Sequence, residues 1–78
     1  PTFAALATSL AMQALVALGE VENPLTKARQ KDLEAARDTI DLLLMLQEKT
    51  KGNLDREESA LLAELIADLQ VRFVENAR

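Results

Sequence analysis

The stretch from Phe3 to Leu18, FAALATSLAMQALVAL, contains 13 apolar residues, three uncharged polar residues and no charged residue. A helix on the surface of a globular protein normally presents a charged or polar face to solvent. Because this stretch offers no such face, the sequence predicts a helix that is buried by other protein elements on more than one side.

The rest of the composition predicts an all-α chain that forms a single helical domain over residues 1–78. The chain has two Phe, no Trp and no Tyr, so Leu, Ala, Ile, Val and Met must build the core. β-branched residues nowhere alternate with polar ones as they do in a half-buried strand. Two Gly and two Pro punctuate the chain sparsely, which favours a few long elements.

Capping residues predict the ends of the first and third of three helices. The first helix covers residues 3–18, with Thr2 as N-cap and Gly19 in the left-handed conformation that ends a helix. The third helix covers about residues 55–76, where Asp55 opens a capping-box variant.

The second helix is predicted over about residues 25–51. Asn23 followed by Pro24 fits an N-cap with proline at the first helical position, and Thr26 is the alternative start. Two lysines in the last turn suit the negative end of the helix dipole, and Gly52 ends the helix in the left-handed region. Since the next connection is short, we expect the second and third helices to form a long antiparallel hairpin.

Alanines in the first helix predict self-association. Four of them, followed by Leu18, recur at the spacing of heptad a and d positions, where small side chains allow close helix approach. We therefore expect a two-fold homodimeric bundle of about six helices. The alternative is a monomeric three-helix bundle in which these alanines let the first helix sit close to the second. The predicted dimer interface comprises Ala4, Leu6, Ala7, Leu10, Ala11, Ala14, Leu15 and Leu18.

Catalytic, cofactor and metal sites are not expected. The chain has no His and no Cys, which removes the commonest general base and the usual zinc ligands. The carboxylates of Glu34, Asp38, Asp41 and Glu48 lie in one band of the second helix. A hard cation could use them, but a solvated face explains them more simply. We expect no enzyme.

The charge pattern argues against two large classes of partner. A net charge of −4 repels nucleic acid unless cations gather on one face. The sixteen residues of the first helix span only about 24 Å, too short for a bilayer core, and no basic residue precedes them as in a signal peptide. We expect a cytoplasmic protein with no nucleic acid and no membrane as partner. The cations Lys27, Arg29 and Lys31 either pair with nearby carboxylates or face an acidic partner or anionic surface.

Several short motifs spread nearly from end to end carry a family resemblance. The most specific is the run Lys49-Thr50-Lys51-Gly52-Asn53-Leu54, and the weaker ones are Ser9-Leu10-Ala11, Leu18-Gly19, Asn23-Pro24, Ala35, Ile40-Asp41 and Leu61. With these motifs the chain resembles the bacterial domain of unknown function 1844 family. The resemblance implies a short, soluble, helical bacterial protein and implies no activity.

A non-enzymatic dimerisation and protein-interaction module is the function that the sequence favours. Its partners would be a second copy and another protein, the latter held by the outer faces of the two longer helices or by Lys49, Lys51 and Asn53 at the hairpin tip. The alternative is a helical bundle that binds a small apolar or anionic ligand between the first helix and the hairpin. Because Pro1 opens the chain, either an initiator Met was removed or the domain belongs to a longer protein.

Overall fold

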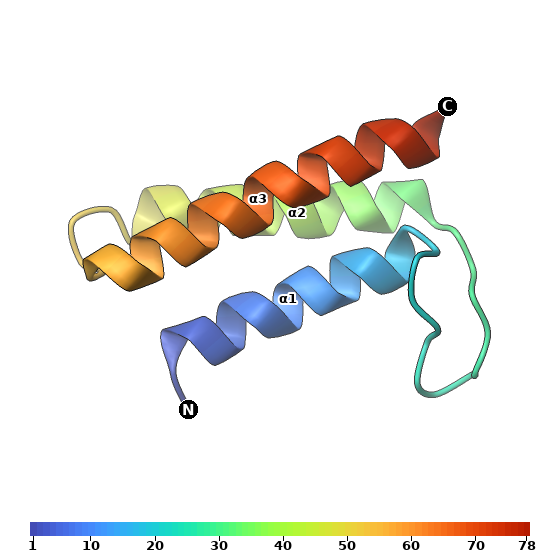
Figure 1. Ribbon diagram of the computed structural model, residues 1–78, viewed down its shortest axis with the longest axis horizontal. Helices are drawn as coiled ribbons and strands as arrows, with labels where there is room; N and C mark the ends of the chain where they lie inside the picture. The colour runs from blue at the N-terminus through green and yellow to red at the C-terminus, as the bar shows by residue number, and fades with distance from the viewer.

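The computed structural model describes all residues from 1 to 78 and contains three helices and no strand. These are α1 (Phe3–Ala17), α2 (Leu33–Lys49) and α3 (Arg56–Ala77). They lie side by side, and the two connecting segments lie at opposite ends of the bundle (Figure 1). The prediction of an all-α chain is confirmed.

The caps of α1 lie where the sequence predicted them. The Thr2 hydroxyl accepts a hydrogen bond from the Ala5 amide at 3.0 Å, which satisfies one of the free donors of the first turn. At the other end Leu18 caps the helix, and Gly19 follows with a φ of 79°. Glycine adopts this left-handed conformation without the Cβ clash that other residues meet.

The predicted start of α2 at residue 25 is wrong, because the helix begins at Leu33. Asn23 does open one helical turn, since its carbonyl accepts the Lys27 amide at 2.8 Å. Lys27 then takes a φ of 61°, which a right-handed helix cannot accommodate, and the turn ends. The actual N-cap is Asp32, whose carboxylate accepts the Ala35 amide at 3.1 Å.

The connection between α2 and α3 follows the predicted local chemistry. Gly52 has a φ of 86°, which confirms its left-handed conformation. Asp55 and Glu58 form a complete capping box, with each side chain accepting the other residue's backbone amide at 2.8 and 3.0 Å. α2 itself ends at Lys49, two residues before the predicted end, so Lys51 lies in the turn.

Ten apolar side chains form the core: nine lie within the three helices, and the tenth is Leu18, the C-cap of α1. They are Ala7, Ala11, Ala14, Leu18, Ala36, Ile40, Leu43, Leu62, Ile66 and Leu69. No polar side chain is buried among them. The α1 contribution is small in volume, and small residues at a contact allow two helices to approach closely. The alanine seam therefore lies inside the core of one chain, as in the monomeric alternative that the sequence left open.

The start of α2 and the end of α3 meet around an aromatic ring. The Arg37 guanidinium, in the second turn of α2, lies 5.8 Å from the centroid of the Phe73 ring near the end of α3. A hollow of about 280 Å³ beside this contact is lined by residues from both helices, including Ile40, Leu44 and Val74. The beginning of α2 therefore lies beside the end of α3 (Figure 1).

Candidate functional site

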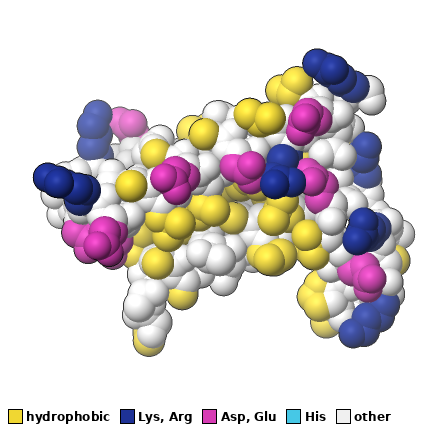
Figure 2. Space-filling view, viewed as in Figure 1, with side chains coloured by type: hydrophobic (Ala, Val, Ile, Leu, Met, Phe, Trp, Pro, Cys, Tyr) yellow, Lys and Arg dark blue, Asp and Glu magenta, His cyan; other side chains and the backbone are white.

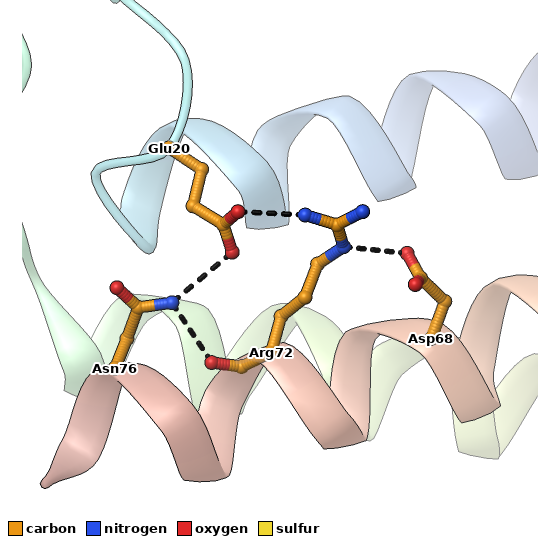
Figure 3. Close-up of polar contacts among 4 residues, drawn as sticks. All are labelled: Glu20, Asp68, Arg72 and Asn76. Atoms are coloured by element: carbon orange, nitrogen blue, oxygen red, sulfur yellow. Dashed lines mark hydrogen bonds and ion pairs between the residues drawn. The ribbon is translucent and has the colours of Figure 1, made fainter.

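A group of four polar side chains ties the segment after α1 to the end of α3 (Figure 3). The Arg72 guanidinium donates to Glu20 Oε1 at 2.6 Å and to Asp68 Oδ2 at 2.8 Å. The Asn76 amide donates to Glu20 Oε2 at 3.1 Å and to the Arg72 carbonyl at 2.9 Å. Both oxygens of Glu20 are thus engaged by side chains from α3.

Electrostatics at this group fit a structural tie and not an acid-base site. Hydrogen bonds to Asp68 and then to Glu20, with their charges, raise the pKa of Arg72 above its usual value. A raised pKa for a cation means that its stabilising contribution is fully present below the pKa of the unfolded state and is lost only as the pH rises through the pKa of the folded state. Arg72 therefore stays protonated throughout the physiological pH range. Lys31 adds a second tie, since its ammonium donates to the Asn76 carbonyl at 3.0 Å.

The predicted partner-binding residues Lys49, Lys51 and Asn53 are all exposed at the turn between α2 and α3. Leu54 tucks partly under this turn and packs against the core. A hollow of about 290 Å³ with mainly polar walls lies beside the turn and includes Lys51 and Ser59. Binding at this tip stays a prediction.

The eight residues of the predicted dimer interface divide into a buried and an accessible set. Ala7, Ala11, Ala14 and Leu18 are buried within the chain itself. Contact with α2 and α3 already removes these side chains from solvent, so a second subunit could not reach them. Ala4, Leu10 and Leu15 are partly buried, and Leu6 remains 48% exposed.

The accessible set continues onto α2. A hollow lined by Gln13, Ala17 and Ala35 identifies the flank of α1 that faces α2, and the flank of α2 that faces α1. Leu6 precedes Gln13 by seven residues and Leu42 follows Ala35 by seven, so each lies on the same flank two turns away. An apolar strip therefore runs along the α1–α2 groove.

Leu6 and Leu42, exposed at 48% and 46%, are the large hydrophobic residues on these two flanks, and Met45, exposed at 48% and one turn after Leu42, borders them on the outer face of α2. We call these three residues the groove strip. The sequence named Leu6 as an interface residue and missed the other two. A signal was present, because the five apolar residues from Leu42 to Leu46 indicated a segment that needs cover from more than one side. In the structure only Leu43 of these five is buried.

Other large hydrophobic residues are exposed away from the groove strip. They are Met12, Leu25, Leu44, Val71 and Val74. Figure 2 shows charged side chains in a row along α3, with hydrophobic side chains gathered below the row over α1. The uncharged surface of α1 thus lies open beside a charged helix.

The charged clusters singled out in the sequence do not form a metal site. No three or more acidic side chains lie close enough together to hold a metal ion. The cations Lys27, Arg29 and Lys31 lie in the loop that precedes α2. None of them forms an ion pair, because both ion pairs of the chain involve Arg72.

None of the three helices is both long enough and apolar enough to cross a bilayer. Searches of curated proteins and of solved structures found no match. The profile of a protein family, described as a domain of unknown function (DUF1844), matches residues 1–75 of the 78. The match covers all three helices almost to the end of α3, so this chain belongs to the DUF1844 family.

Proposed function

We propose that the protein is a non-enzymatic helical module that forms a two-fold homodimer and binds another protein. The subunit contact runs along the α1–α2 groove, with the groove strip of Leu6, Leu42 and Met45 at its centre. The two longer helices form an antiparallel hairpin that supports this surface. The observation that carries the proposal is an apolar strip with no charge on its α1 side.

The free energy available at the strip favours association. Complete burial of a Leu or Met side chain contributes roughly 1.5 to 3 kcal/mol, and about half of each strip residue is still exposed. A two-fold contact uses the same residues from both subunits, which doubles the number of side chains removed from water. For an 8.6 kDa chain with only ten buried residues, this is a substantial addition to a small core.

Sedimentation equilibrium of matched surface variants tests the proposal. Leu6→Glu and Leu42→Glu place a carboxylate in the strip, whereas Val71→Glu places one on α3, where the side chain is 59% exposed. We expect the wild type and Val71→Glu to sediment at about twice 8.6 kDa, and the two strip variants to sediment as folded monomers. A monomeric wild type, or a dimer that only Val71→Glu dissociates, would overturn the proposed contact.

A second candidate function is the binding of a small ligand with an apolar body and an anionic group. The hollow between α2 and α3 supports it, because Ile40, Leu44 and Phe73 give apolar walls and Arg37 supplies a cation. Its volume of about 280 Å³ lies near the lower end for ligand sites. Native mass spectrometry distinguishes the candidates: a stoichiometric extra mass lost in Arg37→Ala supports the ligand, and a dimer mass with nothing added supports the module.

A further inference from the structure

The loop between α1 and α2 projects from one end of the bundle (Figure 1) and carries the most exposed large hydrophobic side chain of the protein. Leu25 is 90% exposed. Its position is fixed from within the loop, since its amide donates to Asn23 Oδ1 at 2.8 Å and the Asn23 amide donates to the Ala28 carbonyl at 2.9 Å. An apolar side chain is thus held in water by an ordered turn.

The surroundings of Leu25 are apolar on the side of α1. Leu25 and Pro24 line a shallow hollow of about 260 Å³ together with Met12 and Val16. Met12 is itself 47% exposed. The hollow offers an inserted apolar side chain contact with the loop and with α1 at once.

The opposite side of the loop is cationic. Lys27, Arg29 and Lys31 are exposed within five positions, and Figure 2 shows dark-blue side chains along the outer edge of the loop, with an acidic side chain between them. Of the loop carboxylates, Glu20 is held by Arg72 and Asp32 caps α2. The segment from Pro24 to Lys31 itself carries these three cations and no carboxylate, because Glu20, Glu22 and Asp32 all lie outside it.

We propose that the loop segment from Pro24 to Lys31 docks an acidic segment of another protein. An aliphatic or aromatic residue of that segment packs against Leu25 and Met12, and its carboxylates meet Lys27 and Arg29. Interfaces of this kind gain most of their affinity from a few central apolar anchors, with complementary charges around them. The docking does not depend on the dimer, because Leu25 lies in the loop and not in the groove strip.

Net charge favours a short acidic protein segment over an extended anionic surface. The whole chain carries −4, so a membrane or a nucleic acid would approach many carboxylates besides the loop cations. Charges beyond about 8 Å are largely screened at physiological salt, and a short segment need approach only the loop.

Selection from a displayed library of random dodecapeptides on the full chain tests the proposal, with affinities then measured by fluorescence anisotropy. We expect the selected peptides to carry one large apolar residue flanked by Asp or Glu. Leu25→Ser should weaken their binding at least about tenfold, and the double variant Lys27→Glu, Arg29→Glu should do the same and remove the salt dependence. Val71→Ser, also an exposed hydrophobic position, should bind as the wild type does.

Other outcomes would overturn the docking proposal. One is a peptide pool without acidic enrichment, and another is equal binding by Leu25→Ser. If Leu25→Ser abolished self-association in sedimentation, the occupant would be a second copy. If vesicles of phosphatidylserine and phosphatidylcholine retained the wild type but not Leu25→Ser, it would be a membrane. Leu6→Glu separates the two proposals, since it should lose the dimer and keep peptide binding.

Discussion

The two connections between helices begin alike and end differently. Each contains a glycine in the left-handed region, Gly19 with a φ of 79° and Gly52 with a φ of 86°. After Gly52 the next helix is capped within three residues, whereas after Gly19 the chain continues to Asp32 before α2 is capped. The short connection is held by bonds between near neighbours, such as Asn53 to Thr50. The long one is also held by hydrogen bonds with α3, in which Glu20 accepts from Arg72 and Lys31 donates to the Asn76 carbonyl.

The short connection is therefore determined by residues close together in the sequence, whereas the long connection depends also on contacts with a distant helix. The two connections also differ in their capacity to bind a partner. The long loop is held both by hydrogen bonds within itself and by bonds to α3, and in this ordered loop Leu25 stays exposed to water. The experiments below test the comparison, from the largest expected effect to the smallest.

Replacing each of the two glycines by valine should destabilise the protein more at Gly19, in the long connection, than at Gly52, in the short one. A non-glycine residue in the left-handed region costs roughly 1 to 2 kcal/mol, and β-branching adds to that. A Cβ at Gly19 would lie in ordinary van der Waals contact with the Lys31 Cβ, at 3.5 Å, which leaves little room for the two methyl groups of valine, whereas a Cβ at Gly52 meets nothing within 4 Å. We expect losses of about 2 to 3 kcal/mol for Gly19→Val and about 1 to 2 for Gly52→Val by urea denaturation. The reverse order would show that the long loop gives way around Lys31.

Alanine at the two capping residues should have unequal effects on helix stability. Asp55→Ala removes the capping box of α3 and should cost about 1 kcal/mol. Asn23→Ala removes a cap from a turn that stops at Lys27, so its effect on global unfolding should be about half as large or less. Paired urea titrations measure both, and an equal loss would mean that the turn at Asn23 is part of the cooperative core.

Breaking the polar tie should loosen the long loop with little effect on the short one. Arg72→Met removes the hydrogen bonds to Glu20 and Asp68, and because the pair is partly exposed its effect on global stability should be smaller than that of Asp55→Ala. Amide exchange should quicken at the Asn23 and Asp32 amides, which bond within the loop and to α1. Arg56→Met, which removes a cation without an ion pair, is the control. Unchanged exchange in the loop would mean that the tie does not hold it.

Glycine at Lys27 should stabilise the protein slightly. Lys27 has a φ of 61°, the one positive value among the non-glycine residues. Relief of the left-handed strain is offset in part by the greater freedom of glycine in the unfolded chain, which leaves a gain of up to about 1 kcal/mol. Lys51→Gly, beside the other turn, lacks this strain and should be neutral or destabilising. A loss of stability in Lys27→Gly would indicate that the lysine side chain makes a needed contact.

Local chemistry explains why much of the fold could be predicted from the sequence. Thr2, Gly52 and Asp55 act through atoms a few residues away, and all three behave as expected. The start of α2 could not be predicted, because Asn23 and Asp32 are both good N-caps. The choice between them depends on the bond from the Asp32 amide to the Ala17 carbonyl at 2.7 Å, which links segments distant in the chain.

For the same reason, the candidate binding surfaces could be predicted only in part from the sequence. The spacing of the alanines predicted a contact between subunits, whereas Ala7, Ala11 and Ala14 are buried within one chain. Leu42 and Met45 could have been inferred from the unbroken apolar run around Leu43. Leu25 could not, since its exposure follows from the late start of α2.

Thermal melting across a concentration series tests the central claim, that the groove strip is a subunit contact. For a dimer, a hundredfold rise in concentration adds about 1.4 kcal/mol of stability per chain, which in a domain of this size corresponds to roughly 5 °C or more. We expect the melting temperature of the wild type to rise by that amount, and that of Leu6→Glu to stay constant. A wild-type melting temperature that does not change with concentration, together with a mass near 8.6 kDa, would contradict the account.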